Sequence, residues 1–220
     1  LVIFVKSGDT TTPSSASTSP SDTPTPAGPA IYSAVAPGSC DQNGATWSQA
    51  PNANITCGSA GATLSTKSAT SDYLFMNFHT PDGTFPSTYQ FAFTGKITKG
   101  DAQAVIFAGI QQQPPVGMEV VAVSQDGHWS LVQIDNTGKV LKMLKSGTLS
   151  GAVSSFKFAV TIDGLGMHAH LNGKGVVSDS DELGDGSQAI IFGVADPGST
   201  TPFAATFSDF TYTPPGTTGS

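Results

Sequence analysis

Alternating apolar and polar residues run through most of the chain after Ile31. In four segments large apolar residues occupy every second position, which is the pattern of a strand with one buried face. These segments are 74–78, 89–93, 156–162 and 203–207. Two further segments, 104–110 and 189–194, are continuously apolar, and this predicts strands covered on both faces.

Turn residues separate these segments. Asp126-Gly127 and Asn172-Gly173 predict two-residue type I′ hairpins, and residues 136–138 suit a three-residue connection. Residues 163–166 close another hairpin. We expect eleven or twelve strands spaced every 8 to 14 residues, with no helical periodicity. The predicted fold class is therefore all-β, a jelly-roll β-sandwich.

The first thirty residues follow another pattern. Leu1–Val5 is apolar but too short to span a bilayer, which takes about 20 residues. We interpret it as the end of a transmembrane helix; a short strand that docks on a sheet edge, in its own or another subunit, is the alternative. In residues 7–30, 17 of 24 residues are Ser, Thr or Pro, which predicts a disordered, stiffened linker. The predicted domains are thus 1–6, the linker 7–30, a sandwich over 31–213, and a flexible tail over 214–220.

The charged-residue composition limits which classes of binding partner the chain can have. The chain has 9 Lys, no Arg and 16 acidic residues, with a net charge of −7. Nucleic-acid binding needs clustered Lys and Arg, so nucleic acid is excluded as a partner. Bidentate recognition of phosphate or carboxylate is equally disfavoured, because that geometry belongs to Arg.

The two cysteines, Cys40 and Cys57, lie 17 positions apart. The neighbouring Ser/Thr/Pro tract suggests the exported side of a membrane, where disulfides form. We therefore predict a Cys40–Cys57 disulfide, which would stabilise the fold by roughly 3 kcal/mol in the chain-entropy model.

Longer stretches resemble a known family. FKFAVTIDGLGMHAHLNGKGVV, followed by the closing PFAATFSDFTYTP, resembles the second half of concanavalin A-like domains of the laminin-G and 3-keto-glycosidase type. PGSCDQNGATWSQAPNANITCG resembles the opening of exported bacterial domains that follow a transmembrane helix and a Ser/Thr/Pro linker, some with a cytoplasmic serine/threonine kinase. The resemblance covers about residues 31–213. It implies an extracellular domain, anchored at the cell surface or secreted, whose only membrane contact is a missing upstream anchor.

His168 and His170 are spaced as a zinc-binding pair on one strand face would be. Met167, Ala169 and Leu171 take the alternate positions and look like the core face. We therefore predict that both histidines point outward, where they face solvent or line a binding groove. The sequence identifies no third metal ligand.

Asp179, Asp181, Glu182 and Asp185 form an acidic run that ends in Gly186. Calcium takes six to eight oxygen ligands, and laminin-G relatives hold calcium near a sandwich rim. Asp179, Asp181 and Asp185 are thus weak calcium candidates. A solvated turn is favoured, because the spacing does not match an EF-hand; no other cofactor is expected.

Glycoside hydrolysis needs two carboxylates around the scissile bond. Glu119 and Glu182 are the only glutamates and lie 63 positions apart. Glu119, within a predicted strand, is a weak catalytic candidate without a partner.

Trp129 is the stronger candidate for ligand binding. If Asp126-Gly127 is a two-residue turn, Ser124 pairs with Trp129, and both share a face with Gln133. A ring flanked by a hydroxyl and an amide suits a sugar, and the resemblance implies that such a face can line a glycan groove. The alternative is that Trp129 covers the edge of the core.

The sequence as a whole favours a non-catalytic cell-surface binding or sensor module with polysaccharide as its ligand. Trp129, Gln133, Ser124, His168 and His170 are the predicted binding residues. One alternative is a glycan-active enzyme of the same fold. The other is a structural subunit that self-assembles by inserting residues 1–5 into a neighbour.

Overall fold

A computed structural model describes much of the predicted sandwich. The described residues are 32–33, 45–47, 53–58, 61–68, 73–78, 88–111, 117–135, 139–150, 154–163, 166–179, 189–196 and 200–213. Their regular structure is all β, in fifteen strands rather than the eleven or twelve expected. None of the described segments is a helix long and apolar enough to cross a membrane.

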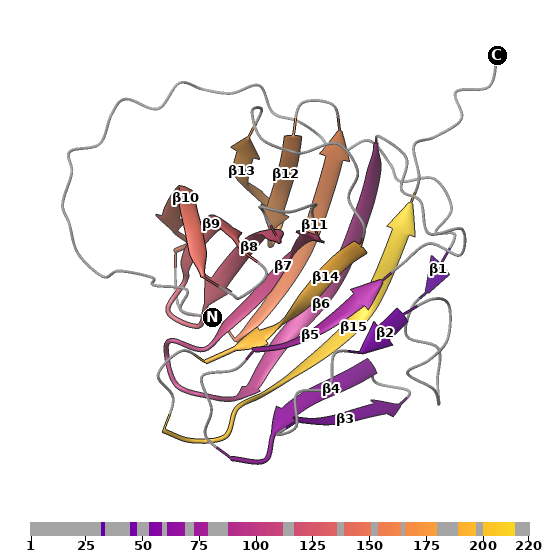
Figure 1. Ribbon diagram of the computed structural model, residues 1–220, viewed down its shortest axis with the longest axis vertical. Helices are drawn as coiled ribbons and strands as arrows, with labels where there is room; N and C mark the ends of the chain where they lie inside the picture. Colours follow the sequence, from indigo (N-terminus) through magenta and orange to yellow (C-terminus); the bar gives the residue numbers. More distant parts are fainter. Residues whose placement is uncertain are drawn as a thin grey trace.

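The larger sheet, sheet A, has eight strands (Figure 1). Their order is β13-β12-β11-β6-β15-β4-β3, and β1 pairs with β15 beside that path. The strands are β1 (Tyr32–Ser33), β3 (Ala53–Gly58), β4 (Gly61–Thr66), β6 (Tyr89–Lys99), β11 (Ser155–Asp163), β12 (Gly166–Leu171), β13 (Lys174–Asp179) and β15 (Ala204–Thr213).

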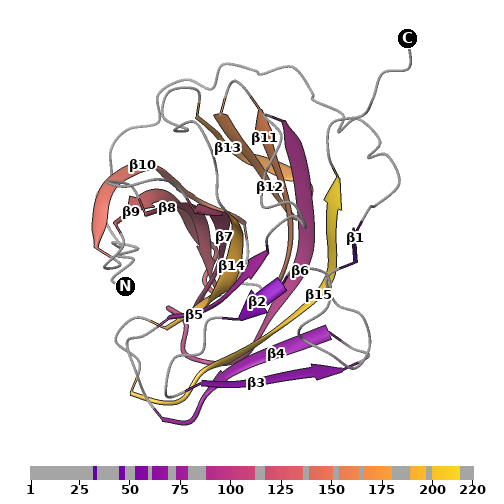
Figure 2. The same cartoon turned by 45° about the vertical axis from the view of Figure 1, so that its right-hand side comes forward.

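The second sheet, sheet B, has seven strands in the order β10-β9-β8-β7-β14-β5-β2. Figure 2 shows it as a curved layer beside sheet A. All strand pairs in both sheets are antiparallel, as expected of a jelly roll. The strands are β2 (Ala45–Trp47), β5 (Tyr73–Phe78), β7 (Val105–Gln111), β8 (Met118–Ser124), β9 (His128–Ile134), β10 (Val140–Thr148) and β14 (Ala189–Ala195).

The core lies between the sheets and is built from the residues that alternation predicted. The inward residues of β6 and β11 are at most 5% exposed. Phe93 stacks on Phe158 at a centroid distance of 4.8 Å, and on Phe192 of sheet B at 4.8 Å. Aromatic stacking across the layers therefore joins the two sheets.

The two continuous apolar runs are buried on both faces, as predicted. Ile106, Ala108 and Ile110 of β7 belong to the inter-sheet core. Val105 and Phe107 belong to a second apolar cluster, on the opposite face of sheet B. Sheet B thus has an apolar outer face, whereas the outer face of sheet A is polar.

Of the two predicted two-residue hairpins, one is confirmed and the other is wrong. Asn172 and Gly173 have φ of 54° and 78° between the paired residues Leu171 and Lys174, which confirms the two-residue turn. The two-residue prediction for Asp126-Gly127 is wrong. There, the Gly127 N–H donates to the Ser124 carbonyl at 2.9 Å, and Gly127 has φ of 87°.

The β8–β9 connection is consequently a three-residue loop, a turn followed by a glycine in the left-handed region. Val123, rather than Ser124, pairs with Trp129. A shift of one residue moves Ser124 to the opposite face of the sheet, because side chains alternate with a period of two.

Candidate functional site

Trp129 lies on the inner face of sheet B and packs against the inter-sheet core. It shares that face with Leu131 and Gln133, as predicted, but not with Ser124. Its indole lies over Gly147 of β10: a Cβ at Gly147 would come within 2.7 Å of the ring. Trp129 is thus half-buried in a slot that Gly147 opens, an arrangement typical of packing at the core edge.

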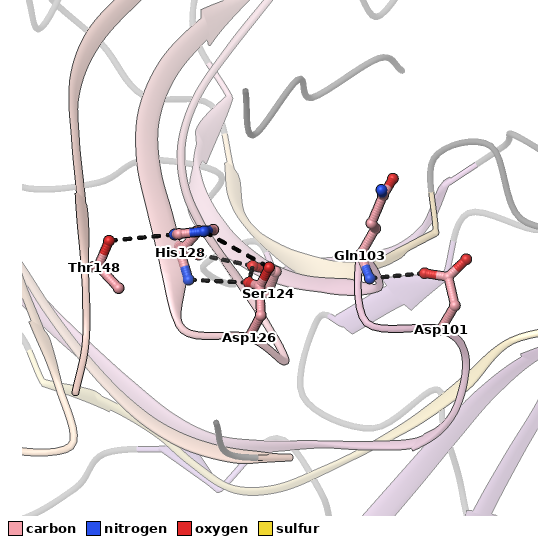
Figure 3. A network of polar contacts seen from close by, with 6 residues as sticks. All are labelled: Asp101, Gln103, Ser124, Asp126, His128 and Thr148. Carbon is pink, nitrogen blue, oxygen red and sulfur yellow. Dashed lines mark hydrogen bonds and ion pairs between the residues drawn. The ribbon is translucent and has the colours of Figure 1, made fainter. Parts of the chain in front are cut away.

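Ser124 is buried and belongs to a network that spans the β8–β9 hairpin (Figure 3). Its hydroxyl donates to the Asp126 carboxylate and lies 3.1 Å from the His128 carbonyl oxygen. The His128 N–H donates to Asp126 at 3.2 Å, and the imidazole Nδ1 lies 3.2 Å from the Thr148 hydroxyl of β10. The network ties the hairpin loop to β10.

These contacts change the acidity of Asp126. Partial desolvation alone would raise the pKa of its carboxyl. The Ser124 hydroxyl, the His128 N–H and the charge of the nearby imidazole outweigh that effect and hold the pKa below its ordinary value of 3.8. The His128 Nε2 lies 3.8 Å from Asp126 Oδ2, so the two groups form a partly exposed ion pair when His128 is protonated.

Ser, His and Asp are the residue types of a hydrolase triad, but their geometry here is different. In a triad the serine hydroxyl bonds to the histidine, which acts as a base. Ser124 instead donates to Asp126 and is only 1% exposed. The arrangement stabilises a turn and does not present a nucleophile.

Glu119, the weak catalytic candidate, is 1% exposed. It shares the inner face of sheet B with Gln133, whose side-chain amide donates to Glu119 Oε2 at 3.2 Å. A general acid needs hydrogen-bond reach to its substrate. Both polar groups face the interior of the sandwich, so neither lies where a polysaccharide could reach it.

In contrast to Glu119 and Gln133, polar side chains on the outer face of sheet A reach the protein surface. One row across four strands consists of His168, Thr161, Gln90 and Thr213, which are paired neighbours. All four are half-buried. The Gln90 side-chain amide donates to the Thr161 hydroxyl at 3.0 Å. This hydrogen bond holds part of the row in place before any ligand binds.

His168 and His170 point outward, while Met167, Ala169 and Leu171 are buried. The His168 Nε2 lies 3.3 Å from the Asp163 carboxylate at the end of β11. The His170 ring lies beside Gly175 of β13, where an added Cβ would be 3.4 Å from its Nε2. No cluster of three metal-ligating side chains occurs among the residues that the structure describes.

Three of the nine lysines lie on strands of the same sheet, toward the other end of β6 and β11 from this row, with Lys96 six positions along β6 from Gln90 and Lys157 four positions along β11 from Thr161. Lys96 and Lys99 are on β6 and Lys157 is on β11, all exposed. Lys157 is paired with Thr94 and Lys96 with Ser155, so the two lysines are diagonal neighbours. The Lys157 N–H donates to the Asn172 side-chain Oδ1 at 2.9 Å, and the Asn172 N–H donates to the Lys157 carbonyl at 2.9 Å, so the backbone of Lys157 is fixed.

Some predicted site residues lie outside the described residues. Cys40, Asp181 and Asp185 are among them, and the side chains of Cys57 and Asp179 are not described although their strands are. The disulfide and the calcium site therefore stay predictions.

No pattern in the sequence indicated Gln90, Thr161 and Lys157 as members of a site. Gln90 and Thr161 occupy the polar positions of predicted strands. The alternation of polar and apolar residues therefore predicts that both lie on the outer face. Their distance of 71 positions in the chain gave no sign that β6 and β11 are neighbours. Sheet order, which local patterns do not encode, brings them together.

No protein-family model and no curated protein matches the chain. Solved structures do match. A sialidase superposes with a TM-score of 0.57 at 8% identity, over 80% of this chain and 17% of its own. The carbohydrate-binding module CBM66 from Bacillus subtilis gives 0.56 at 13% identity, over 79% of this chain and 97% of that module. An alginate lyase of polysaccharide lyase family 7 gives 0.52 at 14% identity, over 76% and 84%.

These identities establish the fold alone. The chain is a jelly-roll β-sandwich of the concanavalin A-like type, in agreement with the expectation from the sequence. It spans only 17% of the sialidase.

Proposed function

We propose that this domain is a non-catalytic polysaccharide-binding module displayed outside the cell. The observation that carries the proposal is the outer face of sheet A, where His168, Thr161 and Gln90 form an ordered polar row on neighbouring strands. Binding sites of this kind depend on a few polar groups held in place before the ligand arrives. Among the proteins of the same fold are a carbohydrate-binding module and an alginate lyase, which supports this class of ligand.

The charge on this face favours an acidic polysaccharide. Lys96, Lys99 and Lys157 are exposed on strands of this sheet, in a chain whose net charge is −7. Asp163, which lies 3.3 Å from His168, and the exposed Asp209 of β15 offset part of the lysine charge. Without Arg, uronate groups would be held by lysine ammonium groups acting as point charges. Such binding weakens as salt is added.

Catalysis is the second candidate, and the positions of Glu119 and Asp126 do not support it. Glu119 faces the interior and contacts Gln133. Asp126 is held in the hairpin network. A substrate on the outer face of sheet A would reach neither of them.

The test compares binding of the full chain to a polyuronate such as alginate and to a neutral β-glucan. The variant Lys96→Ala/Lys157→Ala is expected to lose at least about tenfold in affinity for the polyuronate, because each lost charge contact contributes on the order of 1 kcal/mol. Lys145→Ala, on β10 of the other sheet, is the matched control and should bind like the wild type. Equal affinity of the double variant, or turnover of either polymer, would contradict the proposal.

A further inference from the structure

Strand β10 exposes large apolar side chains to solvent. In the part of the chain that the structure describes, the exposed large hydrophobic residues are Leu141 and Met143, each 46% exposed. Val140 and Leu144 beside them are half-buried and pack against the apolar clusters of the sandwich. Isolated exposed apolar residues are ordinary, whereas neighbouring ones indicate a surface that contacts something else.

β10 is also the last strand of sheet B (Figure 2). It pairs with β9 on one side, and none of the described strands pairs with its other edge. The pairing with β9 is irregular in two places, between Val140 and Lys142 and between Met143 and Lys145. Bulges and lysines are features by which natural sheets prevent the addition of another strand. A further β-strand is therefore a poor partner for this edge.

Three of the nine lysines lie on β10 or directly before it. Lys139, Lys142 and Lys145 follow one another at intervals of three residues, and all three are exposed. Residues 135–148 contain these lysines and a single acidic residue, Asp135, in a chain whose net charge is −7. The strand is thus a basic and partly apolar edge on an acidic molecule.

Lysines beside exposed apolar side chains suit the surface of an anionic bilayer. Apolar side chains bury themselves at the boundary between head groups and acyl chains, and each nearby lysine strengthens the attraction to anionic lipids. The apolar stem of a lysine lies along that boundary while its ammonium group reaches the head groups. A bilayer surface, unlike an added strand, needs no regular ladder of backbone hydrogen bonds. The irregular pairing of β10 is therefore no obstacle to it.

We propose that the β10 edge is a membrane-contact surface, which binds anionic head groups through its three lysines and inserts Leu141 and Met143 at the interface. Such a contact is peripheral and reversible, and it weakens as salt is added. The contact is edge-on, so the outer face of sheet A stays open to a ligand. The proposal is independent of the proposed function, because the two surfaces share no residue. It also requires nothing of residues 1–31, which lie outside the described residues.

The test is co-sedimentation of the full chain with vesicles of phosphatidylglycerol and phosphatidylcholine in equal parts, and with vesicles of phosphatidylcholine alone. The wild type should bind the anionic vesicles at least about tenfold more tightly, because each lysine near the surface adds to the attraction. Lys145→Ser and Leu141→Ser/Met143→Ser should each weaken this binding severalfold. Lys67→Ser removes the same charge from an exposed position that follows β4, and this control should bind like the wild type.

Two outcomes of the co-sedimentation would overturn the proposal. One is the absence of a preference for anionic vesicles, which is also the result expected if the edge serves an acidic protein instead. The other is binding that Leu141→Ser/Met143→Ser leaves unchanged, or that Lys67→Ser weakens as much as Lys145→Ser does. Such binding would belong to another part of the chain, for example to Leu1–Val5.

NMR of labelled methionine methyl groups detects the contact without any substitution. In the full chain, a spin-labelled lipid in anionic bicelles should broaden the Met143 signal, relative to the same bicelles without the spin label. Met167 is buried in the inter-sheet core and serves as the internal reference, whose signal should keep its intensity. Equal broadening of both signals, or broadening of neither, would contradict insertion of the β10 edge.

Discussion

The contact between Trp129 and Gly147 decides between the two interpretations of Trp129, ligand binding and packing at the core edge. The hairpin register turns Trp129 inward, and Gly147 leaves room for its indole, which a Cβ would approach to 2.7 Å. A tryptophan with polar neighbours in the sequence is therefore a core-edge residue in the structure. Ring and glycine act as one packing unit.

We predict that Gly147→Ala lowers the free energy of unfolding by about 1–3 kcal/mol, the usual cost of overpacking. In a Trp129→Ala background the same substitution should cost almost nothing, because the clash is gone. A double-mutant cycle by urea unfolding measures this coupling. Equal costs in both backgrounds would show that the indole does not occupy this slot.

Asp126 leads to a prediction about pH. Its pKa in the folded state is below 3.8, so its contribution to stability is complete above that value and is lost as the pH falls through the lowered pKa. Asp126→Asn should therefore lower the free energy of unfolding at neutral pH, by less than about 1 kcal/mol because the side chain is 45% exposed. At a pH below both pKa values the variant and the wild type should be equally stable. A difference that persists unchanged in acid would contradict the assignment.

Strand β15 shows which buried residues alternation predicts correctly and at which residue the prediction fails. The sequence placed Phe207 inward, and it is buried. Phe210, three positions later, should then face outward, yet it is 1% exposed and stacks on Phe192 at 5.2 Å. Asp209 has φ of 57°, and the pairing with β6 shifts between Ser208 and Thr211. This bulge inserts one residue and returns Phe210 to the core.

Phe210→Ala should lower the free energy of unfolding by about 3–5 kcal/mol, as expected for a buried aromatic residue. Thr211→Ala, its matched control on the outer face, should change it by less than about 1 kcal/mol. Urea unfolding of the two variants reads the register of β15 directly. Similar costs at both positions would mean that the bulge is absent.

The β15 strand and the β8–β9 hairpin show how much of the fold the sequence could predict. Alternation and turn residues identified the strands, their faces and the jelly-roll class, because burial follows a period of two. The β8–β9 loop gained a residue, and this moved Ser124 away from Trp129. Bulges and loop lengths depend on pairing between strands, which a single segment does not reveal. For the same reason, the histidines were placed on the correct face without their neighbours Gln90 and Thr161.

The whole molecule has two outer faces of opposite character. Sheet A presents hydroxyl, amide, imidazole and lysine groups, whereas the outer face of sheet B is apolar and buried. We propose that polysaccharide binds on the first of these faces, across β6, β11 and β12.

An NMR titration of the full chain with a polyuronate oligosaccharide tests this claim most directly. We predict that the imidazole signals of His168 and His170 shift, together with amide signals of β6, β11 and β12, while those of His128 and the β8–β9 hairpin stay in place. Shifts confined to the β8–β9 hairpin, or to the buried apolar residues on the outer face of sheet B, would contradict this proposal.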